Sequence, residues 1–163
     1  MVQFDNQYRQ IKIKVVYYGP AVGGKTTCLQ HIHRALDPQR RTKLYSLNTA
    51  ADRTLFFDLL SLNLGRIRGY RLALQLYTVP GQVQYNATRR TVLAGADGIV
   101  FVADSQLEQE QANSESLENL WKNMAANGLD RQTVPLVLQY NKRDLEPIMP
   151  LEQMQQALNA DQV

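Results

Sequence analysis

Apolar runs and segments with helical spacing alternate along this chain, as they do in α/β proteins. Residues 11–18 (IKIKVVYY) alternate and then become continuously apolar, which is typical of a strand buried in a parallel sheet. Residues 27–36 then place apolar side chains at helical intervals. Unbroken apolar runs predict two further buried strands at 98–103 (GIVFVA) and 134–140 (VPLVLQY). We therefore expect a mostly parallel, open sheet with helices on both faces.

Two neighbouring segments predict one antiparallel hairpin within this sheet. Residues 56–67 contain alternating leucines, residues 71–79 (RLALQLYTV) alternate again, and residues 68–70 form the turn. Later helices are predicted from the i, i+3, i+4, i+7 spacing of apolar residues in 117–124 and from the proline that opens a helix at Pro150. A sheet of this kind usually continues with one more strand and helix, about 20 to 25 residues. We therefore expect these last two elements to be missing after residue 159.

Length and composition indicate one soluble domain. The 163 residues are enough for a single core, so we expect one domain over 1–163. No apolar run approaches the ~20 residues of a membrane span, and the N-terminus lacks the apolar region of a signal peptide. Basic residues occur in short clusters without interleaved aromatic residues, which disfavours nucleic-acid binding. The sequence thus predicts a cytoplasmic protein that reaches membranes only through partners.

Residues 19–26 read GPAVGGKT and match the phosphate-loop motif G-x-x-x-x-G-K-[ST]. A strand precedes the motif and a helix follows it, so backbone N–H groups and the helix N-terminus would point at a polyphosphate. A chance match in a surface loop is the alternative. We expect Lys25 to reach the β- and γ-phosphates and the Thr26 hydroxyl to bind Mg²⁺. The loop residues expected to bind nucleotide are Gly19, Val22, Gly23, Gly24, Lys25, Thr26 and Thr27.

A second motif identifies the base. Residues 141–144 read NKRD and fit N-K-x-D, the guanine signature of Ras-like GTPases. Guanine presents two N–H donors on one edge, and the Asp144 carboxylate can accept both. Asn141 can donate to guanine O6 or brace the phosphate loop, and the aliphatic stem of Lys142 can cover one face of the base. The sequence therefore predicts GTP and GDP as ligands, although a polar loop after a strand is the alternative.

The stretch 78–82 (TVPGQ) aligns with the D-x-x-G-Q motif of Ras-like GTPases, with Thr78 at the aspartate position. A hydroxyl can hold a metal-bound water but supplies no charge, so Mg²⁺ retention should depend more on Thr26, the phosphates and the first switch. We expect Gly81 to donate its N–H to the γ-phosphate. Gln82 stands where a water-orienting glutamine is expected, an exposed loop glutamine being the alternative.

The segment before the hairpin is the predicted first switch. Thr54 is the candidate that contacts both Mg²⁺ and the γ-phosphate, which makes Thr26 and Thr54 the predicted metal ligands. Arg53 adjoins it and could neutralise transition-state charge from within the chain, as an arginine finger does. A solvent-exposed loop arginine is the competing interpretation.

Together these residues resemble the MglA family of bacterial gliding-motility and cell-polarity GTPases. The resemblance is carried by VVYYGPAVGGKTT, TLFFD, LYTVPGQVQYNATR, FVADSQ and QYNKRDL, and it spans nearly the whole chain. A threonine at the usual aspartate position is itself a mark of this family. The resemblance implies a small Ras-like GTPase with a P-loop NTPase fold that cycles between GDP and GTP forms at cell poles. It also implies polarity and motility effectors, an arginine in cis, and a homodimeric, MglB-like roadblock-fold activating partner.

Two functions remain in competition. The first is a switch that hydrolyses GTP slowly, and the second is a non-hydrolysing module that recruits effectors when GTP is bound. A small-molecule kinase also uses a phosphate loop, but N-K-x-D argues against it.

Overall fold

The computed structural model describes residues 2–46 and 57–159. Its strands form one seven-stranded sheet in the order β3-β4-β5-β2-β6-β7, with β1 pairing to β2. The strands are β1 (Gln3–Asp5), β2 (Gln10–Tyr18), β3 (Tyr45–Ser46), β4 (Asp58–Ile67), β5 (Tyr70–Thr78), β6 (Gly98–Asp104) and β7 (Leu136–Asn141).

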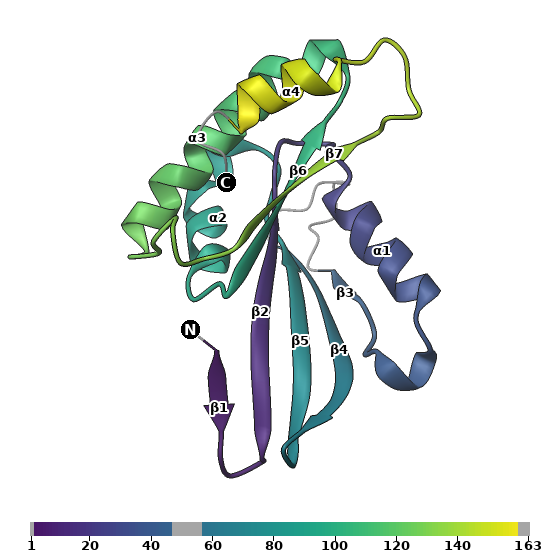
Figure 1. The fold of residues 1–163 in the computed structure, drawn as a ribbon, viewed down its shortest axis with the longest axis vertical. Helices are drawn as coiled ribbons and strands as arrows, with labels where there is room; N and C mark the ends of the chain where they lie inside the picture. Colours follow the sequence, from purple (N-terminus) through teal and green to yellow (C-terminus); the bar gives the residue numbers. More distant parts are fainter. Residues whose placement is uncertain (1, 47–56, 160–163) are drawn as a thin grey trace.

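The described residues also form four α-helices and three short 3₁₀ turns, and the last helix follows β7. The helices are α1 (Lys25–Ala35), α2 (Asn86–Leu93), α3 (Glu110–Ala126) and α4 (Leu151–Leu158), and the turns are η1 (Pro38–Arg40), η2 (Val83–Tyr85) and η3 (Leu107–Gln109). Helix α1 covers one face of the sheet, whereas α2, α3 and α4 lie on the other (Figure 1). Among the described residues, no helix has the length and apolar character needed to cross a membrane.

The centre of the sheet is parallel, as predicted. Strand β2 pairs in parallel with β5 and β6, and β6 pairs in parallel with β7. The predicted hairpin is the antiparallel pair β4–β5. Two further antiparallel pairings were not foreseen, β1–β2 and β3–β4, because strands of three and two residues are too short to show alternation. The predicted mostly parallel α/β sheet with an antiparallel hairpin is therefore confirmed.

Each face of the sheet carries its own apolar cluster, as a half-buried pleated strand requires. Because successive side chains alternate between faces, Val16 and Tyr18 of β2 point to one cluster and Tyr17 to the other. The α1 side contains Tyr17, Leu29, Leu60, Leu62, Leu76 and Val102. The opposite side includes Val16, Tyr18, Leu93, Ile99, Phe101, Leu120, Met124 and Met154.

Several predicted boundaries shift by one or two residues. Strand β7 begins at Leu136, two residues later than predicted, because Pro135 has no N–H to donate to the ladder. Helix α1 begins at Lys25, inside the phosphate-loop motif. Strand β7 ends the described sheet and leaves Val137 58% exposed, and the further strand and helix stay a prediction.

Candidate nucleotide-binding site

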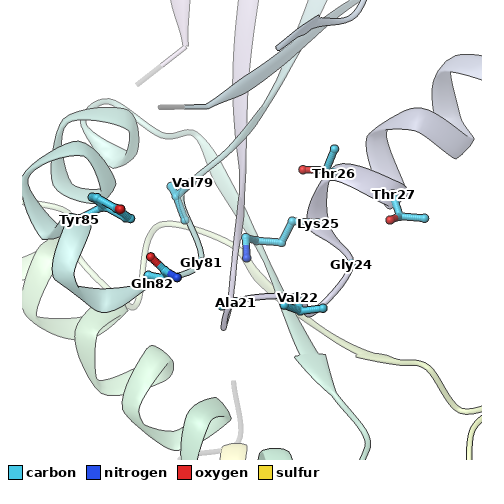
Figure 2. Close-up of a pocket in the computed structure, with 10 residues that line it drawn as sticks. All are labelled: Ala21, Val22, Gly24, Lys25, Thr26, Thr27, Val79, Gly81, Gln82 and Tyr85. Atoms are coloured by element: carbon cyan, nitrogen blue, oxygen red, sulfur yellow. The ribbon is translucent and has the colours of Figure 1, made fainter. Parts of the chain in front are cut away.

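A cavity of about 530 Å³ opens where β2 and β5 end. Parallel strands present their carboxyl ends at one edge, which is where open α/β sheets bind ligands. The lining combines the loop before α1 with the segment after β5 (Figure 2). Its residues are Ala21, Val22, Gly24, Lys25, Thr26, Thr27, Val79, Gly81, Gln82 and Tyr85. Five of the seven residues predicted to bind nucleotide in the loop, namely Val22, Gly24, Lys25, Thr26 and Thr27, therefore line one cavity with Gly81 and Gln82, whereas Gly19 and Gly23 are not part of its lining.

The phosphate loop holds a backbone conformation that only particular residues allow. Gly24 has a φ of 100°, and a Cβ there would lie 2.3 Å from Nδ2 of Asn141. A side chain at Gly19 would meet the Val102 carbonyl oxygen at 2.2 Å. Val22 has a φ of 58° and is 84% exposed, an unusual conformation for a β-branched residue. Strain of this kind persists at functional sites when the surrounding structure imposes it.

Lys25 extends from the start of α1 toward the segment that carries Gly81 and Gln82 (Figure 2). Its ammonium group is buried and donates to the carbonyl oxygens of Pro20 (2.6 Å) and Gly19 (3.1 Å). Burial, followed by the nearby positive charge of Arg89, lowers the pKa of Lys25 to about 7. A phosphate group entering the cavity would favour the charged form of this lysine.

The Asp58 carboxylate lies beside Thr26, a predicted metal ligand, and Thr78, the threonine at the usual aspartate position, and the sequence analysis missed it. The hydroxyls of Thr26 and Thr78 donate to Asp58 Oδ2 over 2.6 Å and 2.8 Å. The backbone N–H of Asp58 donates in turn to the Thr78 hydroxyl (2.9 Å). Asp58 is fully buried, and its Oδ1 has no hydrogen-bond partner. The negative charge that Thr78 itself does not supply is therefore present beside it, on the carboxylate of Asp58 in β4.

This oxygen set fits Mg²⁺. Mg²⁺ prefers hard oxygen ligands and usually keeps several waters while taking few protein groups. Thr26 offers a hydroxyl, and Asp58 offers a buried negative charge with one unpaired oxygen. In the described parts of the chain, no group of three acidic, histidine or cysteine residues is arranged to hold a metal ion. The sequence did carry a signal, since an aspartate interrupts the apolar run FFDLL.

A fully buried arginine holds the segment after β5, and the sequence analysis missed it too. Arg89 of α2 donates through Nη1 to the carbonyl oxygens of Gly81 (2.7 Å) and Pro80 (3.1 Å). Its Nε donates to the Tyr18 hydroxyl and its Nη2 to the Ser116 hydroxyl. These bonds fix the direction of the Gly81 peptide. The sequence did carry a signal, because Arg89 lies three and four residues before the apolar Val92 and Leu93 and therefore shares their buried face of α2.

The Gly81 backbone packs directly on the phosphate loop. A Cβ at Gly81 would lie 2.3 Å from the Ala21 Cα, so only glycine fits. Gln82 follows it, and its Oε1 accepts from Nε2 of Gln84 (2.9 Å). Its predicted water-orienting role stays a prediction, as do the roles of Arg53 and Thr54, which lie outside the described residues.

The predicted guanine segment reaches the phosphate loop. Asn141 Nδ2 donates to the Gly23 carbonyl oxygen (2.9 Å). Of the two roles considered for Asn141, donation to guanine O6 and bracing of the phosphate loop, this contact corresponds to the second. Lys142 has a φ of 60°, and its Nζ pairs with the nearly fully buried Asp104 Oδ2 (2.6 Å). Asp144 follows and is exposed. Asp104 was not foreseen, although an acidic residue at the end of an apolar strand was a signal.

The fold and these contacts define a class of protein. A phosphate loop, a threonine–carboxylate cluster and an N-K-x-D segment meet at one edge of a mixed α/β sheet. This is the arrangement of a small, Ras-like P-loop GTPase.

Comparison with known proteins gives the family. The sequence model of the ADP-ribosylation factor family matches residues 2–163. The chain is also 55% identical over 151 residues to the "Mutual gliding-motility protein MglA" of Myxococcus xanthus (strain DK1622). That alignment covers 93% of this chain and 77% of the relative. The chain therefore belongs to the ADP-ribosylation factor family, as a member of its MglA group of GTP-hydrolysing small GTPases.

Proposed function

We propose that this chain is a molecular switch that alternates between GDP and GTP forms with Mg²⁺ and hydrolyses GTP slowly. The observation that supports it most is the hydrogen bond from Asn141 Nδ2 to the Gly23 carbonyl oxygen, which joins segments 118 residues apart. It connects the candidate guanine segment to the phosphate loop, as a single bound nucleotide requires. Membership of a GTP-hydrolysing family favours this function over a non-hydrolysing binding module.

Nucleotide binding would divide between the two segments. The phosphates would lie in the cavity, against the loop N–H groups and Lys25, whose ammonium now donates to Pro20 and Gly19. The base would lie toward Asp144, which would accept the two N–H donors of guanine. Lys142, held by Asp104, would present its aliphatic stem to the base.

Mg²⁺ would neutralise charge on the phosphate oxygens when it is bound. Thr26 and, from the undescribed segment, Thr54 are the proposed ligands. Asp58 would then hold the Thr26 hydroxyl and Thr78 in fixed orientations, since it accepts from both. Groups that orient metal ligands in this way typically change metal affinity ~10- to 100-fold when they are lost.

Hydrolysis would depend on Gln82 and Arg53. Gln82 would orient the attacking water, and Arg53 would neutralise charge that develops on the γ-phosphate. Gln82 now bonds to Gln84, so it must turn before it can act, which is one reason for slow intrinsic turnover. A homodimeric, MglB-like roadblock-fold partner would accelerate the reaction by stabilising the closed arrangement.

The biological setting follows from the relative. Its name assigns it to gliding motility, and we propose a related role in motility or cell polarity for this chain, through effectors that recognise the GTP form. Recruitment to cell poles belongs to the same proposal.

Nucleotide specificity tests the binding half of this function. In Asp144→Asn the amide presents an N–H to the donor edge of guanine, so preference should move from GTP toward xanthosine triphosphate, whose O2 accepts. Competition of both nucleotides against fluorescent GDP measures the change. An unaltered GTP preference would refute the assignment of Asp144.

A further inference from the structure

The end of the sheet farthest from the phosphate loop carries a basic face. Strands β2, β5 and β4 extend there beyond α2 and α3, toward the bottom of Figure 1. The register pairs Gln10 with Arg71 and Arg71 with Arg66, so these side chains share one face. Lys12, two residues along β2 from Gln10, points to the same face.

A groove of about 200 Å³ lies beside these strands. One wall is the segment after α1, which is tied to β4 because the Thr42 N–H donates to the Ser61 carbonyl oxygen (2.9 Å). Arg40 and Arg71 line the groove and are exposed. The other lining residues are Gln10, Gln39, Arg41, Thr42, Ser61, Leu62, Asn63 and Ala73. The groove is therefore polar, positively charged and closed on one side.

Its basic residues have no acidic partners among the described residues. The ion pairs Lys122–Glu118 and Lys142–Asp104 lie away from the groove. Arg66 and Arg71 stand directly opposite each other in the ladder, a placement that destabilises a sheet because like charges repel. Asp5 is the one carboxylate that the described strand register brings to this face, and its Oδ1 accepts from the Tyr8 N–H. A negatively charged ligand would relieve this repulsion.

Basic residues are concentrated in the part of the chain that forms this groove. Residues 2–46 and 57–79 contain 11 basic and 3 acidic residues, whereas residues 80–159 contain 6 basic and 10 acidic residues. The groove lies in the positive half, so its field is reinforced rather than cancelled by the surrounding sequence.

We propose that this groove docks an acidic, extended segment of a partner protein. Arginine pairs bidentately with carboxylates, and Arg66 and Arg71, side by side, could engage successive acidic side chains. We favour a protein segment over a lipid membrane, because the flat surface of a bilayer cannot enter a groove. No aromatic side chain among the described residues lines it, and single-stranded nucleic acids stack their bases on such side chains.

Peptide binding tests the proposal on the full, GDP-loaded chain. The probe is a fluorescein-labelled peptide of eight glutamates, followed by anisotropy, and its control is the same peptide made of glutamines. We expect saturable binding of the glutamate peptide alone, weakened at least about tenfold by Arg71→Glu and further by Arg66→Glu. The matched control is Arg34→Glu, an exposed charge reversal on α1, which should leave the affinity unchanged. Retained GDP shows that each variant is folded.

Three results would overturn the proposal. The first is equal affinity for the two peptides. The second is equal weakening by Arg34→Glu and Arg71→Glu, which would mean attraction to net charge only. The third is tighter, Arg71-dependent binding of phosphatidylserine vesicles or of a single-stranded oligonucleotide, which would assign the groove to another ligand.

Discussion

Replacement of Asp58 by asparagine separates a metal-supporting role from a merely structural one. The change keeps the size of the side chain and removes its charge. Asp58 accepts hydrogen bonds from Thr26 (2.6 Å) and Thr78 (2.8 Å), and its second oxygen is buried without a partner. In the metal-free protein the charge is therefore costly, whereas near Mg²⁺ it is favourable.

The expected size follows from these contacts. Loss of a group that orients a metal ligand typically lowers metal affinity ~10- to 100-fold, which is about 1.4–2.8 kcal/mol. Asp58→Asn should thus raise by that factor the Mg²⁺ concentration that half-maximally slows GDP release. The melting temperature of the metal-free protein should stay equal or rise, because a neutral amide is cheaper to bury.

The assay follows release of fluorescent GDP across a Mg²⁺ titration, with thermal melting in chelator as its companion. Asp37→Asn is the matched control, since Asp37 is exposed and only accepts from the Gln39 N–H in η1. An unchanged Mg²⁺ midpoint would refute the role given to Asp58. A fall in both metal affinity and metal-free stability would reduce that role to structural support.

Three further predictions concern the lysine, the buried arginine and the hairpin. Because burial lowers the pKa of Lys25 to about 7 and a phosphate favours its charged form, GDP binding should take up ~0.5 proton at pH 7 and more at pH 8. The affinity for GDP should therefore fall as the pH rises above 7. Calorimetry in buffers of different ionisation enthalpy, corrected for the titration of GDP itself, measures this uptake, and a value that does not grow with pH would contradict it. Arg89→Met should lower kcat for stimulated hydrolysis ~10-fold or more, whereas GDP affinity should change only a few-fold. Arg89→Lys should restore part of the lost kcat, and an equal loss of kcat and GDP affinity would indicate general destabilisation. We expect GTP binding to slide β4 along β5 by two residues, because an even step keeps the same side chains on the buried face. An oxidised cysteine pair at Ser61 and Gln75, which face each other across β4 and β5, should then retain GDP binding but block stimulated hydrolysis, and normal stimulation would exclude the slide.

The phosphate loop could be predicted because its conformation and chemistry reside in consecutive residues. The glycines, the lysine and the threonine of residues 19–26 stand between a clear strand and a clear helix, and the structure brings Gly24, Lys25 and Thr26 to one cavity. The N-K-x-D segment was predictable for the same reason. Its contact with the phosphate loop then follows from the parallel order of the strands.

The missed residues act through pairing that a single sequence does not reveal. Asp58 precedes Thr78 by 20 residues and meets it only because β4 and β5 pair with Leu59 opposite Tyr77. Arg89 stands beside the exposed Arg90, and only the packing of α2 distinguishes the two.

Single-turnover hydrolysis of GTP tests the central claim most directly. The rate is measured for the chain alone, with a homodimeric roadblock-fold partner, and with a partner that lacks exposed arginines. The account predicts slow turnover alone and strong acceleration by either partner. That acceleration should be lost in Arg53→Ala and Gln82→Leu, while GTP binding is retained, because a guanidinium at the γ-phosphate is typically worth ~10³ to 10⁵ in rate. Absence of hydrolysis under every condition, or acceleration that survives Arg53→Ala and disappears with the partner's arginines, would contradict it.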